Sequence, residues 1–147
     1  MAAEMAAKGV LVEVNLTSNA VILELDGLAH PYAWLRQRGV PVSLSTDDAG
    51  ILRIDLSHEY ARAGEGGATY AHLKASARNA LAFSFLPGMG LWTDPGRYRK
   101  PVRACAGQIG RQVPQPGPCA DLIAASDKAR EQWRHEALLK AFEARVR

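Results

Sequence analysis

The sequence predicts an α/β protein in which two parallel strands are joined by a helix. Val42–Thr46 is a short uncharged run with β-branched residues, as is typical of a strand covered by helical layers. Gly39 suits the end of the preceding helix, and Pro41 suits the first position of a strand. A similar apolar run, Val10–Leu16, occurs earlier, and the helical segment between the two runs makes their connection a parallel crossover.

The elements around these two strands follow from local signals. Residues 1–8 are strong helix formers, and Gly9 ends that run. The segment Val21–Leu25 is a weaker candidate for a third strand. Pro31 is tolerated in the first turn of a helix, which predicts a helix over residues 32–38.

The second half of the sequence is read as helices separated by one long loop. Asp55 can cap a helix over residues 56–63, and apolar residues recur at helical spacing over 70–85. Six prolines and six glycines between residues 87 and 120 predict an irregular surface loop. A final helix is predicted from Asp121 to Val146. Its expected packing stripe consists of Trp133, Ala137, Leu138, Ala141 and Phe142.

Composition limits the possible partners. The 147 residues include 18 Lys or Arg and 15 Asp or Glu, a formal charge of +3. Because the basic residues are scattered, we expect no nucleic-acid partner. The one loose cluster is interpreted as a solvated loop rather than an RNA or phosphate patch. It consists of Arg97, Arg99, Lys100, Arg103 and Arg111.

The cysteine content and the N-terminal residues predict a location. Cys105 and Cys119 could pair in an oxidising compartment, but the N-terminal residues contain no apolar run of signal-peptide length. We therefore expect reduced thiols and a cytoplasmic protein. No apolar stretch is long enough to predict a transmembrane helix, so we expect no membrane partner.

Two adjacent carboxylates, Asp47 and Asp48, stand where the second strand ends. Ligands of parallel α/β folds gather at the carboxyl ends of strands, so the pair indicates a site. Ser18 and Asn19 end the earlier strand and are expected on the same rim. Each also has a structural interpretation: Asp47 could cap the next turn, Asp48 could be a solvated turn residue, and the Ser-Asn pair could form a turn.

The order of these motifs resembles the last third of an adenosine deaminase, a zinc-dependent barrel enzyme of the amidohydrolase superfamily. The resemblance runs from about Met1 to Gly88. The segments that carry it are Val12–Asn19, His30-Pro31, Gly39–Pro41, Ser45–Asp48, Glu59-Tyr60, Leu73-Lys74, Arg78-Asn79 and Ser84–Pro87.

The resemblance implies an incomplete TIM (β/α)8 barrel, made of the last two β/α units plus C-terminal helices. A complete barrel needs roughly 250 residues, which is more than this chain has. Residues 1–88 would form the C-terminal β/α units, 89–120 a Pro/Gly-rich loop, and 121–147 the C-terminal helix of the same domain. We expect a truncated piece of a longer enzyme.

The resemblance also implies roles for the four site residues. Asp47 would be catalytic, as the carboxylate ligand of a zinc ion and a contact of the activated water. Asp48 would accept a hydrogen bond from the purine, and Ser18 and Asn19 would shape the substrate pocket. The family's His-x-His, third imidazole ligand, Glu proton donor and second His near the water are missing here. We therefore expect the single Zn²⁺ of a complete barrel not to be retained by this chain alone.

Three functional hypotheses follow. In the first, the parent enzyme hydrolyses adenosine or deoxyadenosine to inosine or deoxyinosine, and this chain is inactive by itself. In the second, the chain is a non-catalytic barrel remnant that self-associates or binds a complementary barrel fragment, because its sheet edges would lack partners. In the third, it is an unrelated small α/β binding module.

Overall fold

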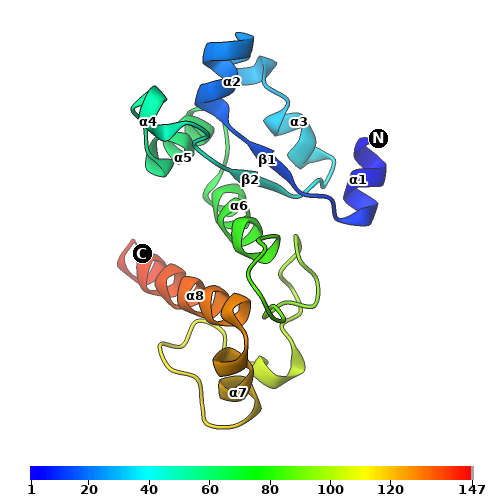
Figure 1. The fold of residues 1–147 in the computed structure, drawn as a ribbon, viewed down its shortest axis with the longest axis vertical. Helices are drawn as coiled ribbons and strands as arrows, with labels where there is room; N and C mark the ends of the chain where they lie inside the picture. The colour runs from blue at the N-terminus through cyan, green and yellow to red at the C-terminus, as the bar shows by residue number, and fades with distance from the viewer. Residues whose placement is uncertain (147) are drawn as a thin grey trace. The chain divides into compact units, whose positions relative to one another are not determined.

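A computed structural model describes residues 1–146 as a mixed α/β chain in which helices dominate (Figure 1). The chain forms two compact units, Met1–Ala80 and a second unit that begins at Leu81. Among the described residues, no helix is both long and apolar enough to cross a membrane.

The first unit alternates short helices with two strands. Its elements, in order, are α1 (Ala2–Lys8), β1 (Val12–Val14), α2 (Leu16–Leu23), the 3-10 helix η1 (Gly27–Ala29), α3 (Tyr32–Gln37), β2 (Val42–Leu44), α4 (Ala49–Leu52) and α5 (Leu56–Glu65), followed by α6 (Tyr70–Ala82), which begins in this unit.

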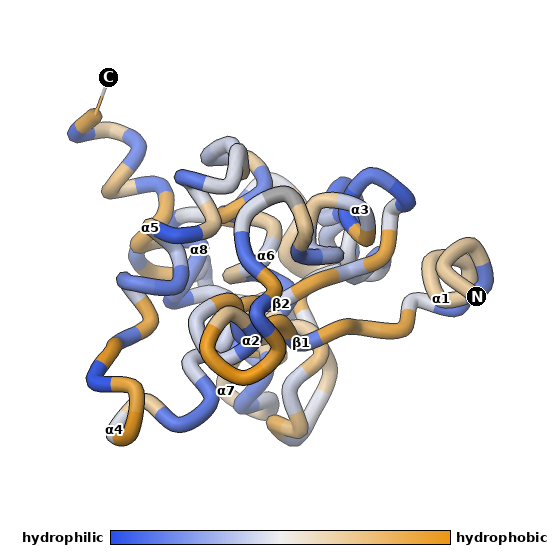
Figure 2. Tube along the Cα trace, turned by 90° about the horizontal axis from the view of Figure 1, so that it is seen from above, coloured by the Kyte–Doolittle hydropathy of each residue, from blue (hydrophilic) through white to orange (hydrophobic). Residues whose placement is uncertain are grey.

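The two strands form a parallel sheet, as the sequence predicts, with Val12 opposite Val42 and Val14 opposite Leu44. Every residue of β2 is buried, and both strands lie in hydrophobic stretches of the trace (Figure 2). The core of this unit joins side chains of both strands to helical residues. Its buried members are Val14, Leu16, Tyr32, Val42, Leu44 and Ala63.

Several helix boundaries are where local chemistry predicts them. Gly9 and Gly39 adopt left-handed conformations, with φ of 64° and 72°, and end α1 and α3. The Asp55 side chain caps α5, because its Oδ1 accepts a hydrogen bond from the His58 amide at 2.9 Å. From α6, the Asn79 side chain donates to the Val42 carbonyl at 2.8 Å and so fixes that helix against β2.

The predicted third strand, Val21–Leu25, is wrong, and β1 is shorter than expected. The chain leaves the sheet after Val14 and forms α2, which covers residues 16–23. The cause is distant in the sequence: the buried Glu59 carboxylate of α5 accepts hydrogen bonds from the first amides of α2. This non-local cap stabilises the start of α2, where the N-cap residue Asn15 makes no side-chain capping bond of its own.

The second unit contains the 3-10 helix η2 (Arg103–Cys105), α7 (Pro118–Ala125) and α8 (Asp127–Arg145). The predicted final helix is therefore two helices that meet at Ser126. The Ser126 hydroxyl donates to the Met89 carbonyl at 2.6 Å and accepts from the Ala129 amide, so it caps α8. Residue 147, the last residue of the predicted segment 121–147, lies outside the described residues.

The predicted packing stripe of the last helix is only partly correct. Trp133 and Ala137 are buried, whereas Leu138 and Phe142 are 60% and 50% exposed. The other buried residues on α8 include Gln132, whose Oε1 accepts from the Leu91 amide at 2.7 Å. The helix therefore packs partly through polar contacts with the Pro/Gly-rich segment, which hydropathy patterns do not reveal.

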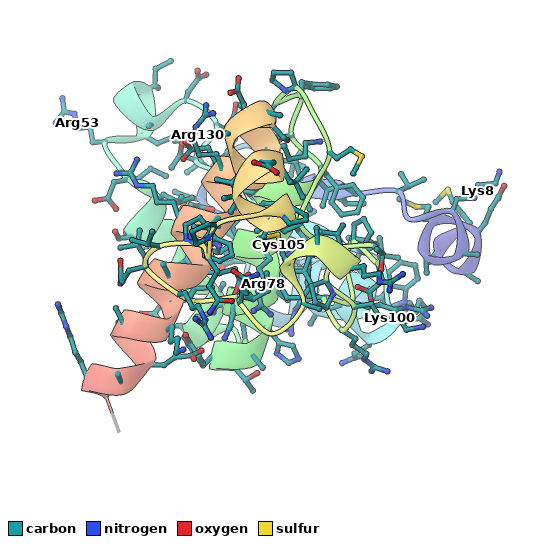
Figure 3. All side chains as sticks on the ribbon, turned by 90° about the horizontal axis from the view of Figure 1, so that it is seen from below. Lys8, Arg53, Arg78, Lys100, Cys105 and Arg130 are labelled. Carbon is teal, nitrogen blue, oxygen red and sulfur yellow. A yellow bond between two sulfur atoms is a disulfide. The ribbon has the colours of Figure 1, made fainter. Side chains whose placement is uncertain are left out.

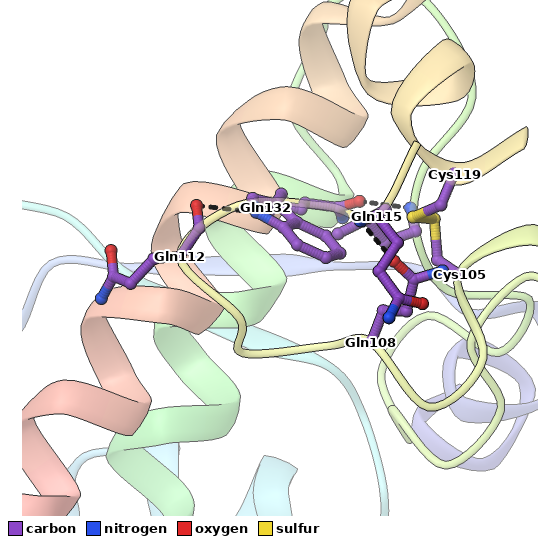
Figure 4. The surroundings of a disulfide bond; sticks show 8 residues. Cys105, Gln108, Gln112, Gln115, Cys119 and Gln132 are labelled. Carbon is purple, nitrogen blue, oxygen red and sulfur yellow. Dashed lines mark hydrogen bonds between the residues drawn. A yellow bond between two sulfur atoms is a disulfide. The ribbon is translucent and has the colours of Figure 1, made fainter. Parts of the chain in front are cut away.

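The Pro/Gly-rich segment supplies the core of the second unit instead of lying wholly on the surface. Leu91 and Cys105 are fully buried, and they pack with Cys119, Ala129 and Trp133. Cys105 and Cys119 form a disulfide, so the expectation of reduced thiols is wrong (Figure 4). Compact packing of an irregular segment brings together two cysteines 14 positions apart, which spacing alone does not predict.

Candidate functional site

The candidate site lies at the carboxyl ends of β1 and β2, which form one edge of the parallel sheet. There the Ser18 hydroxyl donates a hydrogen bond to Asp47 Oδ2 at 2.8 Å. Ser18 is buried and Asp47 is exposed. The fold thus brings together two predicted site residues from different β/α units, 29 positions apart.

The backbone after β2 turns so that the two acids do not continue the strand. β2 ends at Leu44, although the Ser45 amide still donates to the Val14 carbonyl at 3.0 Å. Asp47 then adopts a left-handed conformation with φ of 55°, which aspartate tolerates better than most residues. Its side chain bonds to Ser18 and does not cap the following turn. Asp48 is exposed at the N-cap of α4 and makes no side-chain capping bond there.

Asn19, the fourth predicted site residue, contacts a buried histidine. Asn19 Oδ1 lies 3.1 Å from His30 Nε2, while the Tyr32 amide donates to His30 Nδ1 at 3.0 Å. These contacts assign the ring proton to Nε2. Burial lowers the pKa of His30, an effect that the negative charges of Asp26 and Glu59 oppose. His30 is therefore a buried, neutral residue that contacts Asn19 through one ring nitrogen and the Tyr32 amide through the other.

Glu59 is the main residue whose position the sequence analysis missed. Its side chain is fully buried, and its Oε2 and Oε1 accept from the amides of Leu16 and Thr17 at 2.7 and 3.1 Å. These amides immediately precede Ser18, so Glu59 fixes the segment that carries half of the candidate site. The spacing in the sequence carries one signal for this burial. Glu59 lies four residues before Ala63, so the two side chains share one face of α5, and that face is buried.

A pocket of about 420 Å³ is lined by residues of α2, η1, α3 and α5. Asp26 and Arg62 both line it and form an ion pair at 2.8 Å, and this contact is the main reason that the pKa of Asp26 is lowered. His30 and Leu16 also line the pocket, whereas Asp47 and Asp48 do not. The acid pair therefore does not form this pocket.

The residues present do not by themselves form a zinc site. Among residues 1–146, no three His, Cys, Asp or Glu side chains gather closely enough to hold a metal ion. A catalytic zinc ordinarily has three protein ligands, and the candidate site offers carboxylates without imidazoles. One oxygen of Asp47 already accepts the Ser18 hydrogen bond.

Comparison with known proteins identifies the family. The adenosine deaminase family model matches residues 1–90. The adenosine deaminase of Serratia proteamaculans is 36% identical over 84 residues, which are 56% of this chain and 25% of that enzyme. Those of Proteus mirabilis and Escherichia coli are 35% and 33% identical over 77 and 79 residues, in each case 51% of this chain and 23% of the relative.

The chain spans about a quarter of the length of these curated relatives. No solved structure matches it significantly. The family match includes both strands, all four predicted site residues and Glu59. The chain therefore belongs to the adenosine deaminase family.

Proposed function

We propose that this chain forms the last two β/α units of an adenosine deaminase barrel, an incomplete TIM (β/α)8 barrel when taken alone. The complete barrel would hydrolyse adenosine or deoxyadenosine to inosine or deoxyinosine. The observation that carries the proposal is the hydrogen bond between Ser18 and Asp47 at the shared carboxyl edge of β1 and β2. It supports a site at the edge where barrel enzymes bind their substrates.

In this proposal the four site residues act together. Asp47 supplies one carboxylate ligand to a zinc ion, and Ser18 holds that carboxylate in one orientation through its hydroxyl. Asp48, exposed at the N-cap of α4, accepts a hydrogen bond from the purine. Asn19 shapes the pocket wall and is itself held by His30. Zinc would supply an activated water, and the missing imidazole ligands and proton donor must come from other barrel units.

The proposed organisation keeps residues 1–88 as β/α units, 89–120 as a Pro/Gly-rich loop and 121–147 as the C-terminal helical part of the same domain. The cytoplasmic location stays a prediction, and a buried disulfide is uncommon in that compartment. Because the described residues lack a complete donor set, the isolated chain should retain no stoichiometric zinc and should not deaminate adenosine.

A chimera tests the proposal directly. In the Serratia proteamaculans enzyme, the matched segment is replaced by the corresponding residues of this chain. We expect the chimera to convert adenosine to inosine, as measured by chromatography. Asp47→Asn should abolish detectable turnover and lower the zinc content, and Ser18→Ala should lose about 10- to 100-fold in activity.

The matched control is Glu4→Gln, which removes a carboxylate from α1, at the opposite end of β1. Its surface ion pair with Lys8 contributes little, so activity and zinc content should stay unchanged. A folded, active chimera that tolerates Asp47→Asn would contradict the assignment of Asp47. Adenosine turnover by the isolated 147-residue chain would contradict the proposal that the donor set is incomplete.

The second hypothesis, association with another chain, is favoured by specific surfaces. Within residues 1–146 the sheet has two strands, so each strand pairs with the other along one edge and has no partner strand along its second edge. On α2, Val21, Ile22 and Leu23 are 64%, 70% and 56% exposed. Light scattering of the isolated chain, alone and with the complementary barrel fragment of the relative, separates the cases. A stable inactive self-oligomer supports the remnant, whereas a one-to-one complex with restored deamination supports the split enzyme.

A further inference from the structure

Residues 92–103, which we name the basic loop, lie beyond the part of the chain that the family model matches. The loop carries four cations, and all four are exposed: Arg97, Arg99, Lys100 and Arg103. Between residues 91 and 120 the chain has five Lys or Arg and one Asp, a formal charge of +4. Lys100 is labelled in Figure 3.

The base of the basic loop is closed by backbone contacts. The Thr93 amide donates to the Lys100 carbonyl at 2.9 Å, and the Val102 amide donates to the Leu91 carbonyl at 2.8 Å. Trp92 and Pro101 form an isolated antiparallel bridge between these contacts. Leu91 is fully buried in the core of the second unit. The loop is thus a closed hairpin that is anchored in a packed core.

The single acid of the loop is used to build it. The Asp94 carboxylate accepts hydrogen bonds from the amides of Arg99 and Lys100 at 3.1 and 3.0 Å. The Asp94 carbonyl also accepts from the amides of Arg97 and Tyr98. These hydrogen bonds hold the loop backbone in one conformation, although the Asp94 carboxylate keeps its negative charge.

An aromatic contact fixes the tip of the loop. Tyr98 is buried to 8% exposure and meets the Trp92 ring edge-on, with the ring centroids 5.7 Å apart. Tyr98 has a left-handed backbone, with φ of 55°, which is strained for an aromatic residue. This buried residue separates Arg97 from Arg99, so the flanking arginines stay on the outside of a fixed turn.

The surroundings of the cations identify the chemistry of a partner. Within residues 1–146, none of the four forms an ion pair with a carboxylate. No large apolar side chain between residues 90 and 112 is exposed among the described residues, which argues against membrane insertion and against an apolar protein interface. Guanidinium groups match phosphate oxygens in a bidentate geometry, and the loop also carries the half-buried Trp92, whose ring packs against Tyr98.

We propose that the basic loop binds the phosphate backbone of single-stranded nucleic acid. The sequence alone indicates a solvated loop, because consecutive surface cations are usually mobile and scattered. The structure changes that interpretation, since the loop is closed, its acid is hydrogen-bonded to the loop backbone and its four cations are exposed. Such a surface contacts phosphates without selecting a base sequence.

The test is binding of a fluorescently labelled oligouridylate to the full chain, measured by anisotropy at several salt concentrations. Four phosphate contacts predict that the logarithm of the association constant falls with the logarithm of salt concentration with a slope of about −3. The triple variant Arg97→Ala, Arg99→Ala and Lys100→Ala should reduce the slope to about −1 and weaken binding at least about tenfold at low salt.

Two further variants distinguish binding by the basic loop from attraction by the net charge of the chain. The α8 variant Arg130→Ala, Arg134→Ala and Arg145→Ala removes the same formal charge from exposed positions of the same unit and should bind nearly as well as the parent. Asp94→Ala makes the chain more positive but releases the loop backbone. It should weaken binding if loop order matters, whereas attraction by net charge alone would strengthen binding.

Circular dichroism of each variant confirms that it is folded. An equal loss of binding in the α8 and loop variants would overturn the proposal, as would tighter binding by Asp94→Ala. The proposal also fails if the parent chain binds vesicles of anionic phospholipid or an acidic peptide more tightly than RNA at the same salt concentration. Loss confined to the loop variants, with the predicted salt slope, supports it.

Discussion

Removing the buried Glu59 carboxylate should destabilise the first unit, because this carboxylate accepts hydrogen bonds from two amides at the start of α2. In Glu59→Ala, the amides of Leu16 and Thr17 lose acceptors at 2.7 and 3.1 Å in a buried environment. Each unsatisfied buried donor costs about 1–3 kcal/mol, so the free energy of unfolding should fall by about 2–5 kcal/mol. Glu59→Gln keeps one acceptor oxygen and should cost about half as much.

Urea unfolding of the full chain measures the loss of stability, and amide hydrogen exchange locates it. In Glu59→Ala the exchange of the Leu16 and Thr17 amides should become at least about tenfold faster, because 1.4 kcal/mol corresponds to a factor of ten. The matched control is Glu65→Gln, an exposed carboxylate in the last turn of the same helix. It should change the free energy of unfolding by less than about 0.5 kcal/mol.

Unfolding of Glu59→Ala at the same urea concentration as the parent chain would contradict a stabilising role for Glu59. Retained protection of the Leu16 amide would also contradict it, since another group would then satisfy that donor. A stability loss with unchanged exchange at both amides would place the contribution of Glu59 elsewhere in the core.

Three further predictions concern the disulfide, the buried histidine and a crowded glycine. Cys105→Ser opens a loop of about 15 residues and should lower the free energy of unfolding of the second unit by about 3 kcal/mol, measured by thermal unfolding without reductant. Burial lowers the pKa of His30 from 6.5, so the unfolded chain takes up the His30 proton at a higher pH than the folded chain does. The contribution of His30 to the free energy of unfolding should therefore be complete above pH 6.5 and should be lost as the pH falls toward the folded pKa. His30→Gln should flatten this part of the plot of unfolding free energy against pH. At Gly88, with φ of 93°, an added Cβ would lie 2.3 Å from the Ser126 hydroxyl oxygen, so Gly88→Ala should lower the free energy of unfolding by about 3 kcal/mol. The control Gly107→Ala, at a positive φ but with open space around the Cβ, should lower it by about 1 kcal/mol. Equal losses in the two variants would show that the close contact at Gly88 relaxes freely.

Features that depend on neighbouring residues can be predicted from the local sequence. The helix ends at Gly9 and Gly39 and the cap at Asp55 follow from the backbone freedom of glycine and the acceptor geometry of aspartate. The short apolar runs predicted two parallel strands, which the structure confirms. The ordered motifs predicted the family, which the comparison with known proteins confirms over residues 1–90.

Features that rest on contacts between distant residues cannot be predicted from local patterns and become visible in the folded chain. Glu59 reaches 43 positions back along the chain to the Leu16 amide, ends β1 early and starts α2 where a strand was expected to continue. The Ser18–Asp47 hydrogen bond spans 29 positions, and the Cys105–Cys119 disulfide spans 14. Local propensity differs by about 1 kcal/mol or less between most residues, so a single buried hydrogen bond or cross-link from elsewhere in the chain can override it.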